Sequence, residues 1–179
     1  MVYMFLAEGF EEIEALCPLD LLRRAGVDVK TVAVGEINVR GAHGINVIAD
    51  ITDVEFSDMC PDMVILPGGM PGTLNLDASA AVHKALDAAV SSNAYIAAIC
   101  AAPSILGNRG MLIGKEAICY PGFEDKLRGA TISEKRVVVD GKIITAAGMG
   151  VALEFGLELV SLLCGKDKAD TLRKGVIAD

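Results

Sequence analysis

Cys100 stands where a short apolar run meets the expected start of a helix, a position that suits a reactive thiol. Residues 94–99 are typical of a buried strand, and Pro103 falls in a first helical turn, where its missing N–H costs least. Ala98 and Ala102 leave room for the sharp strand-to-helix turn that presents a nucleophile in hydrolases. A helix start also favours the thiolate. The alternative is a small buried apolar residue, as most free cysteines are.

Three glutamates lie where the first helix is expected to begin. Glu11 and Glu12 fit the ordinary role of acidic residues in a first turn, where they complement the helix dipole and face solvent. Glu14 lies beside the apolar Ile13 and is expected to point partly inward. Burial beside a thiolate would hold the Glu14 carboxyl neutral, so that it could donate a hydrogen bond to Cys100.

Gly68 and Gly69 follow an apolar strand predicted over residues 63–66. One interpretation is an ordinary tight turn, because glycine adopts backbone angles that other residues avoid. The other is that the N–H groups of Gly69 and Ala101 together form an oxyanion hole. The sequence leaves both interpretations open, but no G-K-[ST] follows, so a phosphate-binding loop is not expected.

The remaining chemistry-bearing residues are few. His83, beside Lys84, is expected on a solvated helix face, whereas His43 lies in a glycine-interrupted stretch and could reach a site or an interface. Arg24 is expected at a solvated helix end, where it could also neutralise an anion. With two histidines and five cysteines that form no C-x-x-C pair, we expect no metal, no other cofactor and no disulfide framework.

Length and charge restrict the class of protein. The 179 residues are predicted to form one domain, 1–179, with a core of small and branched aliphatic side chains. A net charge of −8 argues against nucleic acid and anionic membranes as partners. We expect no targeting segment and no membrane span. An odd number of cysteines favours a reducing compartment, hence the cytoplasm.

Strand and helix patterns alternate along the chain. Strands are predicted over 2–6, 28–34, 63–66, 94–99, 116–119, 136–139 and 142–146. A hairpin or extended excursion is expected within 39–49 and a loop over 50–60. Two helices are predicted to end near residues 24 and 108. Four more are predicted over residues 79–92, 124–128, 151–163 and 167–174. This alternation predicts an α/β fold with a mostly parallel sheet, whose sites form beyond the carboxyl ends of the strands.

Five unusual turns are expected to meet at that edge of the sheet. They are residues 11–14, 67–71, 100–101, 120–121 and 148–150.

In chain order, the motifs G-F-E-E-I-E at 9–14, R-R-A-G at 23–26, L-P-G-G at 66–69, A-A-I-C-A-A-P at 97–103 and T-A-A-G at 145–148 resemble the ThiJ/PfpI superfamily. The resemblance covers nearly the whole chain and lies in the branch of the parkinsonism-associated protein deglycase. It implies a flavodoxin-like three-layer sandwich, of the class I glutamine amidotransferase-like type, that forms a homodimer.

The resemblance also implies roles for particular residues. Cys100 matches the reactive nucleophile, Glu14 the protonated glutamate that bonds to it, and Gly69 and Ala101 the oxyanion-type donors. Arg24 and His43 match positions where the family often has basic residues near the site and the dimer interface. Two positions depart from the pattern. Tyr120 replaces a histidine before Pro121, and Ala101 stands where peptidase branches have a histidine, so a Cys-His hydrolase is not favoured.

These observations lead to three functional hypotheses. The first is a cysteine-dependent stress-response enzyme, without a cofactor, that acts on reactive small aldehydes or glycated substrates in the manner of a glyoxalase or deglycase. The second is a non-enzymatic redox sensor or chaperone built on an oxidisable Cys100. The third, a cysteine peptidase or amidase, is disfavoured because no histidine neighbours the thiol in sequence.

Overall fold

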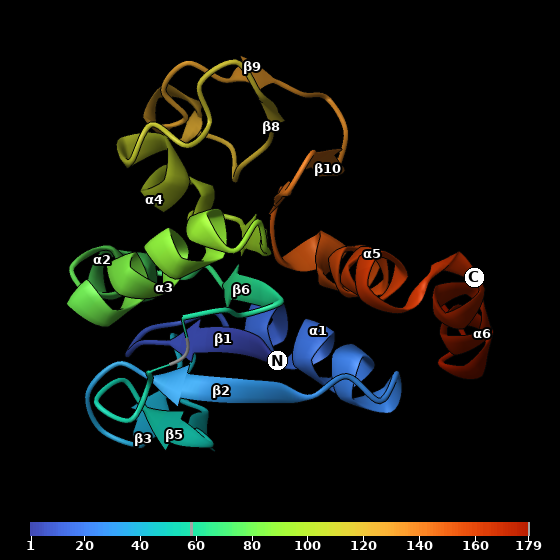
Figure 1. Cartoon of the computed structure of the whole chain (residues 1–179), viewed down its shortest axis with the longest axis horizontal. Coiled ribbons are helices and arrows are strands. Elements are labelled where there is room, and N and C mark those ends of the chain that lie inside the picture. The colour runs from blue at the N-terminus through green and yellow to red at the C-terminus, as the bar shows by residue number, and fades with distance from the viewer. Residues whose placement is uncertain (58, 179) are drawn as a thin grey trace.

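A seven-stranded sheet lies between two layers of helices in the computed structural model, which describes residues 1–57 and 59–178 (Figure 1). The strand order is β10-β11-β7-β6-β1-β2-β5, and only β10 runs antiparallel to its neighbour. The strands are β1 (Val2–Leu6), β2 (Val29–Ala33), β5 (Ile51–Thr52), β6 (Met63–Leu66), β7 (Tyr95–Ile99), β10 (Val137–Asp140) and β11 (Ile143–Ala146). The predicted α/β fold with a mostly parallel sheet is confirmed.

Helices cover both faces of the sheet and so explain why the central strands are apolar throughout. One face packs against α1 (Glu12–Arg24) and α5 (Ala152–Cys164), with α6 (Lys166–Gly175) outside α5. The other face packs against α2 (Gly72–Asp77), α3 (Ala80–Ser91) and α4 (Pro103–Asn108). Gly156 of α5 lies so close to Pro18 of α1 that a Cβ there would come within 2.9 Å of the proline Cα.

The strand register brings the ends of the central strands to one edge. Leu66, the last residue of β6, pairs with Ala98 of β7, and Ile99 pairs with Ala146, the last residue of β11. The loops that follow these strands therefore start side by side. The same edge carries the loop after β1, because β1 and β6 are parallel neighbours where the strand order reverses.

Two small sheets lie outside the main one. The hairpin expected within 39–49 is present as β3 (Asn38–Arg40) and β4 (Asn46–Ile48). The predicted strand over 116–119 is shorter, and it pairs outside the main sheet as β8 (Glu116–Ala117) with β9 (Thr131–Ile132). The hairpin at Asp140-Gly141 joins β10 to β11, as predicted.

Several short elements differ from the sequence prediction. The helix α2, the edge strand β5 and β9 were not expected, and the segment 124–128 contains only the 3-10 turn η1 (Glu124–Lys126). A second 3-10 turn, η2 (Met149–Val151), precedes α5. These elements span two to six residues, too few to carry a periodic apolar pattern.

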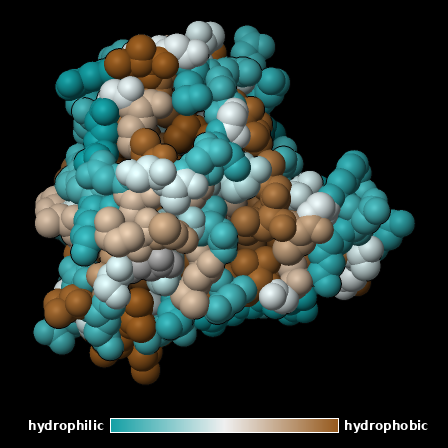
Figure 2. Space-filling model, viewed as in Figure 1, coloured by the Kyte–Doolittle hydropathy of each residue, from teal (hydrophilic) through white to brown (hydrophobic). Residues whose placement is uncertain are grey.

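Two surface properties bear on function. Apolar side chains interrupt a mainly hydrophilic surface on the face in Figure 2. Among the helices of the described residues, none combines the length and the apolar character that crossing a membrane requires.

Candidate active site

Cys100 occupies a strained turn at the carboxyl end of β7. Its φ is 66°, in the left-handed region that residues with a side chain rarely adopt. Backbone hydrogen bonds hold it on both sides, since its N–H donates to the Ala146 carbonyl at 2.8 Å and its own carbonyl accepts from the Tyr120 N–H at 2.8 Å. A strained residue held by its surroundings is typical of a functional position.

The thiol and Glu14 approach each other across a gap that only glycine permits. A Cβ on Gly68 would lie 2.7 Å from the Cys100 Cβ and 2.6 Å from the Glu14 Oε2. Gly68 instead donates its backbone N–H to Glu14 Oε2 at 3.0 Å. Gly69 has a φ of 93°, and a side chain there would collide with the Glu11 backbone. The glycine pair is therefore required by close approach as well as by turn geometry.

Glu14 points inward, and only 1% of its surface is exposed. Burial raises the pKa of its carboxyl to about 7, and the negative charge of Glu11 adds to the rise. Hydrogen bonds from Cys100 and from the Gly68 N–H act in the opposite direction. The carboxyl therefore exchanges its proton close to neutral pH, where a general acid or base works best.

The thiol of Cys100 does not have the low pKa that its place before a helix predicted. Burial raises the pKa of Cys100 to about 12, and the charge of Glu14 and its hydrogen bond add to the rise. Backbone N–H groups of Ala101 and Gly69 point at the sulfur and favour the thiolate. The helix α4 that follows has only six residues, so its dipole is weak. When Glu14 holds a proton, its charge no longer opposes the thiolate.

These groups line a pocket of about 400 Å³ at the carboxyl edge of the sheet. All five turns predicted to meet at this edge contribute a side chain or backbone to it. The lining residues are Glu11, Glu14, His43, Gly69, Met70, Cys100, Ala101, Tyr120, Phe123 and Met149. The apolar residues Met70, Phe123 and Met149 were not singled out from the sequence, although Met70 and Met149 lie inside predicted turns and Phe123 directly follows Tyr120-Pro121-Gly122.

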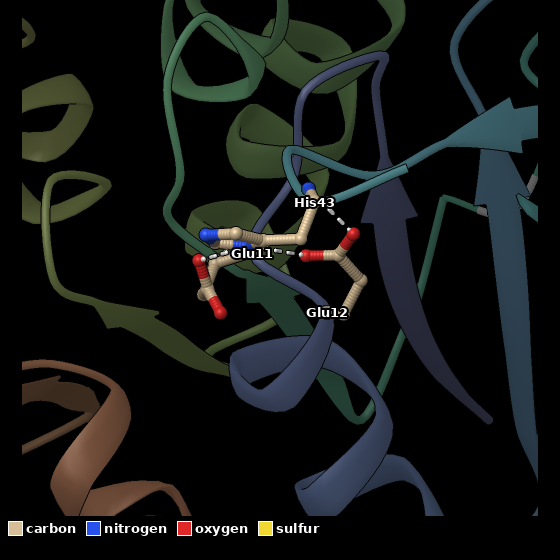
Figure 3. A group of neighbouring side chains, drawn as sticks. All are labelled: Glu11, Glu12 and His43. Carbon is tan, nitrogen blue, oxygen red and sulfur yellow. Dashed lines mark hydrogen bonds and ion pairs between the residues drawn. The ribbon is translucent and has the colours of Figure 1, made fainter. Parts of the chain in front are cut away.

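Glu11 and His43, which line this pocket, form a cluster with Glu12 (Figure 3). The prediction that Glu12 faces solvent is wrong, because Glu12 is 2% exposed. Its Oε1 accepts from the His43 and Ile45 backbone N–H groups at 2.7 and 3.3 Å, and its Oε2 lies 3.0 Å from His43 Nδ1. Glu12 thus ties the loop between β3 and β4 to the start of α1.

Electrostatics strengthens this tie. Burial acts to raise the pKa of Glu12, but the hydrogen bonds from His43 and from the two backbone N–H groups outweigh it and lower the pKa. The hydrogen bond to Glu12 and the charge of Glu11, whose Oε2 lies 3.4 Å from Nδ1, raise the pKa of His43. In the described part of the chain this is the one group with three potential metal-ligand atoms within 4.8 Å of one another, and those atoms already pair internally.

Two other sequence expectations change. His83 is not solvated as predicted but half-buried, with its Nε2 2.7 Å from the Asp77 carbonyl oxygen and its Nδ1 2.8 Å from Arg109 Nη1. Arg24 does not reach the pocket within the chain. It pairs with Asp20 at 2.6 Å, at the far end of a helix that spans about 20 Å.

The parallel sheet with its strand-end cysteine and facing carboxyl defines a flavodoxin-like α/β protein with a nucleophile turn. Comparison with known proteins makes the assignment more specific, because the model of the DJ-1/PfpI family matches residues 1–162. The chain belongs to the DJ-1/PfpI family. The resemblance inferred from its motifs is thereby confirmed.

Individual relatives support the assignment. The chain is 34% identical to protein dj-1beta of Drosophila melanogaster over 97% of its own length and 95% of that protein. It is 41% identical to protein DJ-1 homolog B of Arabidopsis thaliana over 92% of its length, but spans only 38% of that longer protein, and 43% of the plant homolog A. The structure of oxidized Toxoplasma gondii DJ-1 matches with a TM-score of 0.94 at 36% identity, covering 98% and 97% of the two chains.

Proposed function

We propose that this protein is a cysteine-dependent enzyme that acts on small reactive aldehydes, in the manner of a glyoxalase or deglycase. The observation that carries the proposal is the strained Cys100, which shares a pocket with a buried carboxyl whose pKa is about 7. A relative in Caenorhabditis elegans, 31% identical over 93% of this chain, is named a glutathione-independent glyoxalase. The stress-related role of the family agrees with such chemistry.

The residues support a balanced reaction with methylglyoxal. The Cys100 sulfur adds to the aldehyde carbon while its proton passes, by way of the Glu14 carboxylate, to the aldehyde oxygen, which gives a hemithioacetal. Glu14 next takes the proton from that carbon and returns it to the neighbouring carbon, and the carbonyl group moves in the other direction. The resulting thioester is hydrolysed by water to lactate, and the thiol is regenerated. No outside oxidant is required.

Backbone donors and pocket polarity fit the same substrate. The N–H groups of Gly69 and Ala101, which favour the thiolate, would also stabilise oxygen as negative charge develops on it. Methionines and aromatic rings line much of the pocket, and no lysine or arginine of the described residues lines it. Two carboxyl groups face the same space. An uncharged aldehyde, free or on a glycated amine, therefore suits the pocket better than a phosphorylated one.

The test is turnover of methylglyoxal to lactate by purified protein. Cys100→Ser is expected to abolish it, while Cys17→Ser, a half-buried cysteine on α1 that does not line this pocket, keeps wild-type turnover. If Cys100→Ser turned over methylglyoxal as fast as wild type, the enzyme proposal would be abandoned. Release of the aldehyde from a glycated amino acid, measured on the same variants, separates deglycase from glyoxalase activity.

A redox sensor is the second candidate, and the oxidized state of the Toxoplasma relative favours it. Tyr120 stands where the family pattern has a histidine, so this position offers the thiol a phenol in place of an imidazole. Under mild peroxide, mass spectrometry is expected to find two added oxygens on Cys100 before any oxidation of Cys17 or Cys119. Earlier oxidation of either of those cysteines counts against a sensor role.

We also propose that the protein is a homodimer. Large apolar side chains near the pocket are exposed, with Ile13 at 48%, Ile45 at 52% and Met149 at 52%. A second copy would remove them from water. Sedimentation at micromolar concentration is expected to give twice the chain mass of 18.7 kDa. A monomeric mass would refute this proposal.

A cytoplasmic location is likewise a proposal. It rests on the odd number of cysteines, five, which suits a reducing compartment. Cell fractionation tests it, and recovery of the protein with an oxidising compartment would overturn it.

A further inference from the structure

The aldehyde chemistry proposed above leaves several large side chains of the Cys100 pocket without a role. The reacting groups lie at the buried end of the pocket, where Glu14 is 1% exposed. Tyr120 and Met70 line the same pocket but are 51% and 48% exposed, and Phe123 is a third large lining residue. Large side chains held half-exposed around a pocket are typical of a ligand-binding surface.

The segment that carries Tyr120 and Phe123 is tied to the nucleophile turn. The Tyr120 N–H donates to the Cys100 carbonyl at 2.8 Å, and the Phe123 N–H donates to the Tyr120 carbonyl at 3.1 Å. Phe123 also packs against the core on the α3 side of the sheet. Both residues are therefore fixed relative to the thiol before a ligand binds, which reduces the entropy that recognition costs.

The Tyr120 ring also lies close to the acid–base group. A Cβ on Gly148 would lie 3.2 Å from Cδ2 of Tyr120 and 3.9 Å from Oε1 of Glu14. The ring and the carboxyl therefore flank the same glycine backbone. An aldehyde that is bonded to Cys100 and in contact with Glu14 has the Tyr120 ring within reach of its substituent.

Methylglyoxal by itself would make little use of these side chains. The pocket volume of about 400 Å³ falls in the range of about 300–1,000 Å³ that encloses drug-sized ligands, whereas methylglyoxal carries a single methyl group beside its two carbonyls. An aromatic substituent would pack against the Tyr120 ring and the Met70 sulfur, and both contacts stabilise it beyond its removal from water. Among the described residues no lysine or arginine lines the pocket, so an uncharged substituent is favoured.

We propose that Tyr120, Phe123 and Met70 form a specificity subsite that selects 2-oxoaldehydes with an aromatic substituent over methylglyoxal. This inference rests on the function proposed above and names its substrate class. Phenylglyoxal is the simplest such substrate. The Cys100 sulfur adds to its aldehyde carbon, Glu14 moves the proton from that carbon to the neighbouring one, and water releases mandelate, as it releases lactate from methylglyoxal. The Tyr120 ring selects the substituent by packing and takes no part in proton transfer.

The first test compares kcat/KM for phenylglyoxal and methylglyoxal, from the formation of mandelate and lactate by the full chain. Wild type is expected to favour phenylglyoxal by about tenfold or more. Tyr120→Ala is expected to lower this ratio about tenfold, mainly through a higher KM for phenylglyoxal, whereas Tyr120→Phe keeps the ratio within about threefold because the ring remains. Leu74→Ala, which truncates an exposed leucine on α2 outside the pocket, is the matched control and leaves the ratio unchanged.

The second test measures binding without turnover. The neutral ketols 2-hydroxyacetophenone and hydroxyacetone share one head group, lack an aldehyde and differ only in the phenyl or methyl substituent. In NMR titrations of the wild-type chain, 2-hydroxyacetophenone is expected to bind about tenfold more tightly or better. Tyr120→Ala is expected to remove this preference.

The two tests separate the subsite from the enzyme activity. Equal kcat/KM values for the two aldehydes, together with equal ketol affinities, would overturn the subsite and leave the enzyme proposal standing. No turnover of either aldehyde, with the ketol preference intact, would overturn the enzyme proposal and support the subsite. An aromatic preference that survives Tyr120→Ala, or one that Tyr120→Phe removes equally, would show that the Tyr120 ring does not select the substrate.

Discussion

Glu12 and Glu14 lie two residues apart in the first turn of α1, and both are buried, yet their surroundings move their pKa values in opposite directions. Glu12 accepts two backbone N–H groups and faces the His43 ring, and its pKa falls. Glu14 accepts one backbone N–H and faces a thiol, and its pKa rises to about 7. Burial alone therefore does not make a proton carrier. The number of hydrogen-bond donors around each carboxylate determines whether it stays ionised and holds a loop in place or exchanges a proton near neutral pH.

The largest expected effect concerns catalysis. Glu14→Gln keeps the size of the side chain but cannot accept a proton, so kcat for methylglyoxal is expected to fall at least a hundredfold. Glu11→Gln, which lines the same pocket, is expected to change kcat less than tenfold. Steady-state lactate formation measures both. Equal losses in the two variants would remove the distinction between Glu14 and its neighbours.

The next largest expected effect is on the pH dependence of stability, which differs between Glu14 and its neighbours. Because the folded pKa of Glu14 is raised from 4.5 to about 7, its proton stabilises the fold at low pH, and that contribution is lost as pH rises from about 4.5 through about 7. Glu14→Gln stays neutral, so its stability relative to wild type is expected to increase by about 2 kcal/mol between pH 5 and pH 8. Urea unfolding at both pH values measures this, with Glu11→Gln as control. A pH-independent difference would contradict the raised pKa.

Glu12 is expected to affect folding rather than proton transfer. Glu12→Ala leaves the N–H groups of His43 and Ile45 without their acceptor, and the free energy of unfolding is expected to fall by about 2 kcal/mol. Urea denaturation at pH 7 provides the measurement. Glu11→Ala should cost clearly less, since among the described residues no backbone N–H donates to the Glu11 carboxylate. Equal costs would show that the tie to the β3–β4 loop is unimportant.

The smallest effect is the titration of His43. Its pKa is raised by the hydrogen bond to Glu12, and the charge of Glu11 adds to it. NMR titration of the His43 ring is expected to give a midpoint above 6.5, which Glu12→Gln lowers more than Glu11→Gln does. A midpoint insensitive to Glu12→Gln would mean that the contact in Figure 3 does not persist in solution.

The catalytic roles of Cys100, Glu14, Gly69 and Ala101 stay predictions. Their positions at one edge of the sheet, in contrast, were predictable from the order of the motifs along the chain. Small residues flank the thiol, glycines follow β6, and a carboxyl lies near an apolar helix face. Each of these signals is local in the sequence, and the alternation of strands and helices brings the residues to the same edge of the sheet.

The sequence by itself determined the alternating fold, the family and the five turns around the pocket, because apolar periodicity and turn residues are local properties. Only the tertiary structure decided which carboxyl is held as an anion, since that depends on donors 31 and 33 residues away on the β3–β4 loop. It likewise decided that burial outweighs the backbone donors at Cys100. Proton affinity reflects the sum of desolvation and contacts in space, and neighbouring residues in the chain do not reveal that sum.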